Sequence, residues 1–347
     1  MNGGDYVHGY SEREAERLGD QARTLTSLLH SDTRYPAGSR VLEAGCGTGA
    51  QTVILAKNSP DAEITSVDIS PDSIRRAEAR VRSEGITNVT FQTGDLFSLP
   101  FAPESFDHVF VCFVLEHLAD PVRALEVLRS LIRPGGTITV IEGDHGSAYF
   151  HPNSPHSHRA IRCLVDLQQE AGGNALIGRE LYPLLVSAGY ADVLVSPRMV
   201  YVDASRPALV EGFTRQTFTA MVEGVRDTVL SRGLMAPAEW EQGIADLYRT
   251  CEPDGVFCYT FFKGIGTVPP GSPRPFLPIP DRKVSIMPLR APWCRHSSSR
   301  RHKYDGQVSA VTCLEDRNRG GHRAKAERFV PDNLPTGREP DEMQAAV

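Results

Sequence analysis

The chain of 347 residues lacks the long apolar segments of a membrane protein. No apolar run reaches the ~18 residues that a membrane-spanning helix needs. The N-terminus has no charged-then-apolar stretch of the kind that marks a secretory signal. The seven cysteines form no Cys-x-x-Cys pair, and scattered cysteines of this kind are typical of reduced thiols. We therefore predict a cytoplasmic protein without membrane association.

The chain also lacks an excess of positive charge. Lys and Arg number 37 against 43 Asp and Glu. Residues 266–347 hold 14 basic and 9 acidic side chains, so residues 1–265 hold 23 basic and 34 acidic ones. Affinity for nucleic acids depends largely on cationic contacts with phosphates. An acidic body therefore argues against DNA or bulk RNA as a substrate.

The C-terminal segment has little sustained hydrophobic periodicity. Residues 266–347 contain 11 of the 25 prolines and many charged side chains. Such a composition buries too little apolar surface to offset the entropy of ordering the chain. We predict a disordered, Pro-rich basic tail over residues 266–347. A nuclear-targeting or docking role for the basic residues 300–303 is the alternative.

What the chain does have is a glycine-rich turn between a short apolar strand and an apolar helix. The turn reads Glu-Ala-Gly-Cys-Gly-Thr-Gly over residues 43–49. Its three glycines let the backbone turn sharply and approach a ligand closely. The start of the following helix adds unpaired N–H groups and the positive end of a dipole. The turn predicts a nucleotide-like cofactor, and it fits both a dinucleotide fingerprint and the turn that binds S-adenosylmethionine (SAM).

The strands that follow fit SAM better than a dinucleotide. Asp68 ends a second strand, where a carboxylate can accept both hydroxyls of a ribose in either cofactor. Asp95 follows a third strand, where it could meet an adenine amino group. A fourth strand is expected over residues 106–115, with His117 just after it, and a fifth over residues 137–141. Strands that alternate with helices predict a parallel, doubly wound α/β sheet with its ligands at the carboxyl ends of the strands.

The remaining pattern predicts several helices and a long insertion. Helices are expected at about 11–30, 49–58, 71–84, 121–132, 156–171, 178–188, 206–231 and 237–250, with strands at 192–202 and 256–263. Roughly fifty residues separate these last two strands, and long insertions are usually functional. We interpret residues 207–250 as a helical cap over the active site. Its apolar side chains would line that site or, alternatively, only pack the inserted helices together: Phe213, Phe218, Met221 and Trp240.

The ordered motifs resemble the class I SAM-dependent methyltransferase superfamily over about residues 6–264. The segments that carry the resemblance are VLEAGCGTG, VDIS, GDLFSLPF, FDHVFVCFVLEHL and LIRPGGTITVIE. The resemblance implies a seven-stranded Rossmann-like sheet with a helical cap insertion before the last strand, and SAM as the cofactor. It divides the chain into an N-terminal helical lid (1–35), a methyltransferase domain (36–265, with the cap at about 206–250) and the tail.

The resemblance also implies which residues bind SAM. Glutamate and glycines of the turn would line its methionine part, an aspartate its ribose, and a second aspartate with its neighbour its adenine. A phenylalanine would lie beneath the cofactor, and a tyrosine of the lid would close over it. The predicted cofactor-binding residues are Tyr10, Glu43, Gly45, Gly47, Gly49, Asp68, Ile69, Asp95, Leu96 and Phe113.

Methyl transfer asks for alignment of the acceptor and exclusion of water. A base helps when the acceptor is a hydroxyl or a protonated amine, and a neutral imidazole suits that task near pH 7. His117, expected after the fourth strand, and His145, expected after the fifth, are the candidate catalytic residues. Glu142 and Asp144 are further polar residues expected after the fifth strand. The alternatives are a structural or cofactor-lining role for His117 and an acceptor that needs no base.

A cluster of three histidines invites a metal site. His151, His156 and His158 lie within eight residues. The intervening Pro152 and Pro155 and the absence of nearby cysteine argue against a fixed tetrahedral site. We therefore expect no metal, and the histidines could instead line the entrance to the substrate pocket.

The sequence thus predicts an enzyme that moves a methyl group from SAM to O, N or C of a small organic acceptor. Its likeness to stand-alone enzymes favours secondary metabolite biosynthesis. One alternative is a catalytically silent SAM-binding regulatory protein. The other is an NAD-dependent oxidoreductase, which would need a hydride-transfer constellation such as Tyr-x-x-x-Lys, and we expect the chain to lack one. The acceptor and the oligomeric state are not predicted.

Overall fold

The computed structural model describes residues 25–271. Of the helix expected at 11–30, residues 25–30 are described and are helical. The expectations for Tyr10, for the rest of the lid and for the tail beyond residue 271 lie outside the described residues. None of the helices in the described range is long and apolar enough to cross a membrane.

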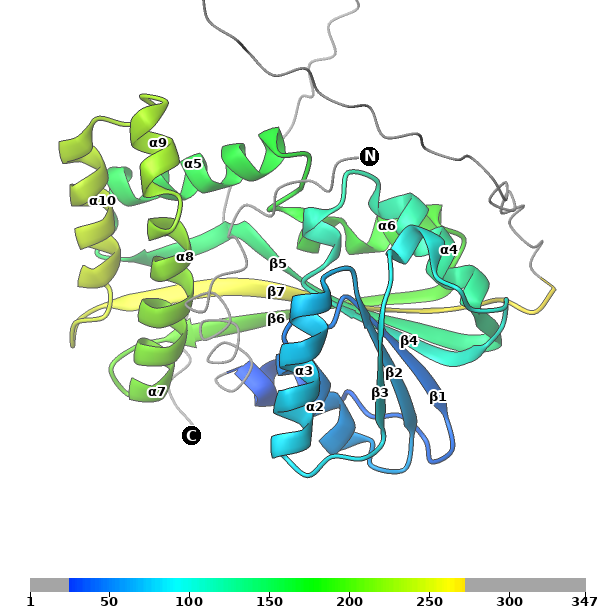
Figure 1. The fold of residues 1–347 in the computed structure, drawn as a ribbon. Coiled ribbons are helices and arrows are strands. Elements are labelled where there is room, and N and C mark those ends of the chain that lie inside the picture. The colour runs from blue at the N-terminus through cyan, green and yellow to red at the C-terminus, as the bar shows by residue number, and fades with distance from the viewer. Residues whose placement is uncertain (1–24, 272–347) are drawn as a thin grey trace, which may run out of the picture. The chain divides into compact units, whose positions relative to one another are not determined.

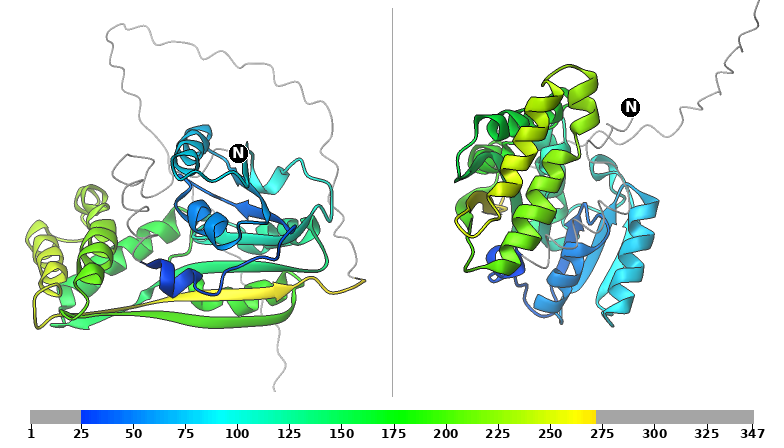
Figure 2. Two further views of the ribbon diagram at one scale, coloured as in Figure 1. Left: turned by 90° about the horizontal axis from the view of Figure 1, so that it is seen from below. Right: turned by 90° about the vertical axis from the view of Figure 1, so that its left-hand side faces the viewer.

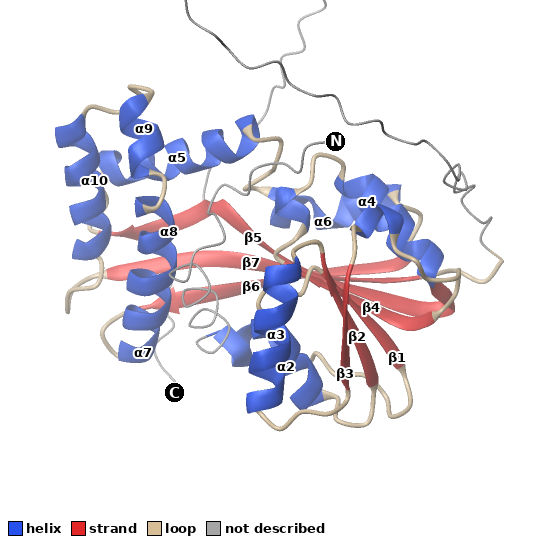
Figure 3. Cartoon of the chain, viewed as in Figure 1, coloured by secondary structure: helices blue, strands red, loops and turns tan. Residues whose placement is uncertain are grey.

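A single mixed sheet of seven strands organises the described chain, in the order β3-β2-β1-β4-β5-β7-β6 (Figures 1 and 3). Strands β1 to β5 run parallel to one another, and β7 runs antiparallel to both β5 and β6. The predicted α/β fold is confirmed. The strands are β1 (Arg40–Ala44), β2 (Glu63–Asp68), β3 (Val89–Thr93), β4 (Phe106–Cys112), β5 (Ile132–His151), β6 (Ala191–Val202) and β7 (Val256–Thr267).

Helices connect the strands and begin at the capping signals in the sequence. The Ser70 side chain accepts a hydrogen bond from the N–H of Ser73 at the start of α3, and Asp120 accepts one from Arg123 at the start of α4, as N-caps do. The connecting helices are α2 (Ala50–Asn58), α3 (Pro71–Ser83), α4 (Pro121–Leu131), α5 (Pro155–Glu170) and α6 (Leu181–Ser187), with short 3₁₀ turns η1 (Leu96–Ser98), η2 (Leu115–His117) and η3 (Ile177–Glu180).

The insertion between β6 and β7 is helical, as predicted. It comprises α7 (Pro207–Leu209), the π-helical segment η4 (Val210–Thr219), α8 (Ala220–Glu223), α9 (Arg226–Ser231) and α10 (Pro237–Arg249). These helices lie together at the end of the sheet where β5, β6 and β7 run on past the other strands (Figures 1 and 2). The sheet is therefore much longer at its antiparallel edge than at its parallel edge.

Three predicted strand boundaries are wrong. The fourth strand ends at Cys112 rather than at residue 115, because Phe113 adopts a positive φ of 58° that turns the chain. The fifth strand spans 20 residues and runs to His151, because β7 continues to pair with it beyond the end of β4. Glu142, Asp144 and His145 consequently lie within β5 rather than after it. The last strand extends to Thr267, so a tail that begins at residue 266 is also wrong.

The hydrophobic core covers both faces of the sheet. Side chains of α2 and residues 25–30 form one cluster, and those of α4 and α6 form the cluster on the opposite face. The apolar side chains of the insertion belong to the first cluster. Phe213 and Phe218 pack edge-on or tilted against aromatic rings of β7, and Trp240 is fully buried. This burial agrees with the alternative interpretation, in which these side chains pack the insertion rather than line a site.

Candidate functional site

The glycine turn follows β1, and each of its glycines has a positive φ: 80° at Gly45, 51° at Gly47 and 78° at Gly49. A Cβ atom at Gly45 would clash with Val114, and one at Gly49 would lie 2.9 Å from Ala77 of α3. These two glycines therefore permit close packing of the turn. A Cβ atom at Gly47 would have no described neighbour within 4 Å, so this glycine borders open space at the start of α2.

Glu43 precedes the turn and is almost fully buried, with 2% of its surface exposed. Its Oε2 accepts hydrogen bonds from the hydroxyls of Thr52 in α2, at 2.7 Å, and Ser66 in β2, at 2.6 Å. Burial raises the pKa of Glu43 to about 7, against the opposing effect of these two hydroxyls. The glutamate thus joins β1, β2 and α2 beneath the turn.

Asp68 lies at the carboxyl end of β2, directly against the turn. Its Oδ2 accepts a hydrogen bond of 2.8 Å from the backbone N–H of Gly47, and its Oδ1 accepts one of 2.9 Å from Ser70. Burial raises the pKa of this carboxyl group. The carboxylate predicted to bind ribose and the glycine that borders open space are therefore immediate neighbours.

The end of β3 continues the same edge. The backbone N–H of Gly94 donates to the carbonyl of Asp68 at 3.0 Å, which places Asp95 beside the end of β2. The Asp95 side chain accepts a hydrogen bond of 3.0 Å from the N–H of Phe97 and so caps η1, which begins at Leu96. Ile69 is 60% exposed and Phe97 is 42% exposed. Exposed apolar side chains next to strand-end carboxylates can receive a flat ring, and Phe97 was not among the predicted residues.

The loop after β4 has unusual backbone geometry. Phe113 has a φ of 58°, a conformation that is rare for a bulky residue and that clusters at functional sites. Its N–H donates to the carbonyl of Ile141 at 2.9 Å, and its ring centroid lies 5.6 Å from that of Phe261. The loop therefore depends on β5 and β7 for its conformation.

Glu142 fixes this loop from β5. Its Oε1 accepts hydrogen bonds from the backbone N–H groups of Val114, at 3.0 Å, and Leu115, at 2.8 Å. The side chain is fully buried. Burial, and then the charge of neighbouring Glu116, raise the pKa of Glu142 well above its usual range. Glu142 consequently anchors the loop from β5.

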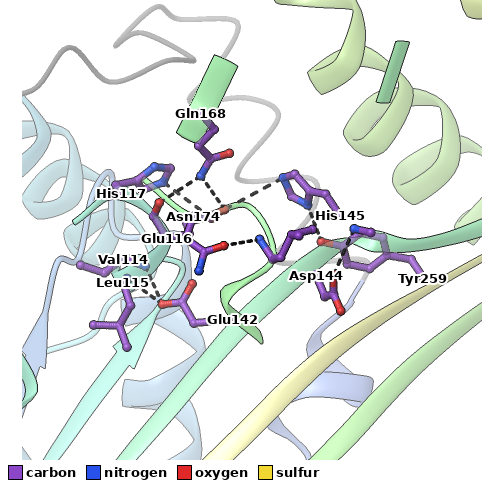
Figure 4. Close-up of polar contacts among 12 residues, drawn as sticks. Val114, Leu115, Glu116, His117, Glu142, Asp144, His145, Gln168, Asn174 and Tyr259 are labelled. Carbon is purple, nitrogen blue, oxygen red and sulfur yellow. Dashed lines mark hydrogen bonds and ion pairs between the residues drawn. The ribbon is translucent and has the colours of Figure 1, made fainter. Parts of the chain in front are cut away.

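The two predicted catalytic histidines lie around one buried carboxylate, that of Glu116 (Figure 4). The Nε2 atom of His117 is 3.6 Å from Glu116 Oε1, and that of His145 is 4.0 Å from Glu116 Oε2. Gln168 of α5 donates to Glu116 Oε2 at 3.2 Å. On its other side, His145 Nδ1 is 2.7 Å from the hydroxyl of Tyr259. The structure thus joins His117 and His145 into one polar network.

Three members of this network were not predicted as site residues. Glu116 could have been predicted from the sequence, since it precedes His117 just after the fourth strand. Gln168 lies 52 residues beyond Glu116, and Tyr259 lies 114 residues beyond His145. No local pattern connects positions that far apart, so only the fold reveals them.

Asp144 has a structural role. It is buried and receives two hydrogen bonds from Arg179, Nε to Oδ2 and Nη2 to Oδ1, both at 2.7 Å. This bidentate pair raises the pKa of Arg179. Because its charge is compensated in this way, Asp144 is a poor candidate for the proton acceptor that its position in the sequence allowed.

The histidine cluster does not gather into a metal site. His158 Nε2 bonds Asn153 at 2.7 Å, and its ring stacks on Phe150 with centroids 4.7 Å apart. His156 is in α5, where its carbonyl faces Gly243 of α10. Within residues 25–271, no group of three His, Cys, Asp or Glu side chains could hold a metal ion.

The expectation that the chain lacks a Tyr-x-x-x-Lys spacing is wrong, because Tyr259 and Lys263 have it. Both residues lie in β7, where positions four apart are separated by about 13 Å. The Nζ atom of Lys263 bonds Asp32 and Thr33, each at 2.7 Å, whereas Tyr259 bonds His145. The two side chains therefore do not form a hydride-transfer constellation.

Comparisons with known proteins indicate a methyltransferase domain. A family model described as a methyltransferase domain matches residues 36–189. The chain is 32% identical over 216 residues to an uncharacterized 37.1 kDa protein in transposon TN4556 of Streptomyces fradiae, covering 61% of each chain. It is 35% identical over 157 residues to an uncharacterized methyltransferase of Schizosaccharomyces pombe, covering 44% of this chain and 56% of the relative.

A third relative has a named activity. The chain is 30% identical over 134 residues to the 27-O-demethylrifamycin SV methyltransferase of Amycolatopsis mediterranei, covering 38% of this chain and 49% of the relative. The matches thus span between about half and three fifths of these curated relatives. Residues 36–189 of the chain therefore match a methyltransferase domain.

Proposed function

We propose that this protein transfers a methyl group from SAM to an O, N or C atom of a small organic acceptor. The observation that carries the proposal is the convergence of the glycine turn, Asp68, Asp95 and the loop at Phe113 at one edge of the parallel strands. Ligands of doubly wound sheets bind at this edge. Bound SAM would supply an electrophilic methyl group on its sulfonium.

Each part of the edge has a proposed task. Asp68 would accept hydrogen bonds from ribose hydroxyls, and Asp95 with Leu96 would hold the adenine, with Ile69 against the ring. The backbone at Gly45 and Gly47 would approach the methionine part, with Glu43 beneath it. The Phe113 ring would form the floor, since Glu142 and Ile141 fix its loop. Gly49 would act through the packing of α2 on α3 rather than by touching the cofactor.

The network around Glu116 would serve the acceptor. It begins at the end of the loop that carries Phe113 and reaches α5 and β7. Its histidines and carboxylate can receive a proton when a protic acceptor is methylated. The acidic composition of residues 1–265 favours a small molecule over a nucleic acid.

A role in secondary metabolite biosynthesis is the finer proposal. It rests on the likeness to the 27-O-demethylrifamycin SV methyltransferase and on the helical insertion between β6 and β7, which we propose caps the acceptor site. The alternatives are a SAM-binding regulatory protein without turnover and an NAD-dependent enzyme.

The test is calorimetric titration with SAM and S-adenosylhomocysteine, with NAD as the control. We expect dissociation constants near 1 μM for the first two, about −8 kcal/mol, and no heat with NAD. A panel of small alcohols, phenols and amines is then incubated with methyl-tritiated SAM. Binding without transfer to any acceptor would favour the regulatory protein, and binding of NAD alone would refute the proposal.

A further inference from the structure

Tyr259 is held against the backbone of β5 in a way that only a glycine permits. Its side chain is 2% exposed, and a Cβ atom at Gly143 would collide with its hydroxyl. The backbone N–H of Asp144 donates toward the same hydroxyl. The phenol is therefore inserted between two strands and fixed at a defined point of β5.

This placement determines which atom donates in the contact with His145. Burial raises the pKa of Tyr259 well above its usual range, so the phenol keeps its proton. Its oxygen already accepts from the Asp144 N–H. Among the described residues, His145 Nδ1, at 2.7 Å, is the acceptor available to the phenolic proton. We conclude that Tyr259 donates and that Nδ1 of His145 accepts.

A neutral imidazole has one donor nitrogen and one acceptor nitrogen. Since Nδ1 accepts from Tyr259, the proton of neutral His145 is on Nε2, which faces Glu116 Oε2 at 4.0 Å. At this distance the two groups interact electrostatically but do not form a hydrogen bond. Such contacts commonly shorten when a ligand binds. In this tautomer Nδ1, the acceptor nitrogen of His145, already receives the proton of Tyr259, so the imidazole is a poor proton acceptor.

Glu116, by contrast, is surrounded by donors. Gln168 donates to its Oε2 at 3.2 Å and to its backbone carbonyl at 3.1 Å. His117 lies 3.6 Å from its Oε1. Burial, and then the charge of Glu116, raise the pKa of the nearby Glu142. Two neighbouring carboxyl groups in different environments take different roles, and Glu116 is the one that faces both histidines.

We propose that Glu116, rather than His145, accepts the proton that the methyl acceptor loses, and that Tyr259 positions Glu116 by fixing the tautomer of His145. This inference rests on the proposed function. An acceptor oxygen forms a bond to the methyl carbon, the carbon–sulfur bond breaks with its electrons remaining on sulfur, and the O–H proton passes to Glu116. The substrate class is therefore a hydroxyl compound, since a neutral amine has a free lone pair and needs no base to be methylated.

The first experiment observes the tautomer directly. Protein labelled with ¹⁵N-histidine is saturated with S-adenosylhomocysteine, and long-range ¹H–¹⁵N correlation spectra are recorded; His145→Gln assigns the His145 signals. We expect a protonated Nε2 and a hydrogen-bonded, unprotonated Nδ1. Tyr259→Phe should shift the Nδ1 resonance, whereas Tyr190→Phe should not, because the hydroxyl of this other buried tyrosine donates to Leu125 at 3.1 Å. A protonated Nδ1 in the wild type, or no shift in Tyr259→Phe, would overturn the positioning role.

The second experiment uses the hydroxyl acceptor found with tritiated SAM. Glu116→Gln should lower kcat by about 100-fold or more, the range for loss of a general base, with affinity for S-adenosylhomocysteine within about twofold. Glu116→Asp, which keeps a carboxylate, should retain part of the activity that Glu116→Gln loses. Tyr259→Phe should lower kcat by about tenfold at unchanged KM. Full turnover in Glu116→Gln, or transfer to amines alone, would refute the role of Glu116. If the wild type itself binds no SAM or methylates nothing, the proposed function fails instead.

Discussion

The parallel and antiparallel halves of the sheet differ in how their functional residues are brought together. In the parallel half, strands β1 to β4 are short, and each proposed cofactor residue lies at the end of its own strand or in the turn after it. In the antiparallel half, β5 and β7 are 20 and 12 residues long, and the network around Glu116 joins side chains from four elements. In the function that we propose, the first half would hold the cofactor by local motifs, and the second would build the acceptor site by packing.

The distinction between the two halves of the sheet would be wrong if the helical insertion were also needed to bind the cofactor. Trp240→Ala removes a fully buried side chain from α10 and should lower the free energy of unfolding by about 3–5 kcal/mol. Because Trp240 lies in the insertion, affinity for SAM of the protein that remains folded should be unchanged. Chemical denaturation and calorimetry measure the two effects. Tyr182→Ala, an exposed aromatic control at 56% exposure, should change stability by less than about 0.5 kcal/mol.

Glu43, a buried carboxyl group of the parallel half, should make the stability of the protein depend on pH. Its pKa is about 7 in the folded protein, against an ordinary value of 4.5. Between these values the folded state holds a proton that the unfolded state has lost, so stability falls as pH rises from about 4.5 to 7. The shift corresponds to a loss on the order of 3 kcal/mol.

Glu43→Gln should remove this part of the pH dependence. The measurement is the free energy of unfolding of both proteins at pH 5 and pH 8. Glu84→Gln is the control, since its exposed carboxyl pairs with Lys57 and has a lowered pKa, the opposite direction. An identical pH dependence in Glu43→Gln and the wild type would contradict the assignment.

A substitution in the glycine turn tests the proposed cofactor site. Gly47→Val would place a branched side chain in the open space beside Asp68, and affinity for SAM should fall by at least about 100-fold, or about 2.8 kcal/mol. Gly38→Val is the matched control, because Gly38 also has a positive φ, 75°, and open space around it. Both variants carry the same kind of backbone strain, so only the loss of SAM binding should differ. Equal calorimetric affinities in the two variants would reject the site.

The smallest expected effect lies at the boundary between the halves. Glu142→Ala leaves the N–H groups of Val114 and Leu115 without their acceptor, which should cost about 1–3 kcal/mol of stability and weaken binding of S-adenosylhomocysteine. Glu142→Gln keeps a neutral acceptor of the same shape and should behave like the wild type. Denaturation and calorimetry on both variants decide this. A Gln variant as weak as the Ala variant would show that Glu142 needs a charge.

The sequence predicted most of the parallel half. Periodicity and capping residues predicted α3 and α4 to within one residue at each end, because Ser70-Pro71 and Asp120-Pro121 are local signals. The length of β5 could not be predicted in this way. The residues that follow Ile141 are polar and end the apolar run, but the hydrogen bonds that continue the strand come from β7, more than a hundred residues further on.

The sequence alone determined the α/β fold class, the resemblance to methyltransferases and the cofactor class, because glycine turns, strand-end carboxylates and helix caps act within a few residues of one another. It also supplied both histidines of the proposed acceptor site. Only the tertiary structure decided that Glu116 lies between them, that Tyr259 reaches His145 past Gly143, and that Asp144 is neutralised by Arg179. These relationships depend on cross-strand and cross-helix packing, which the fold creates and no local pattern encodes.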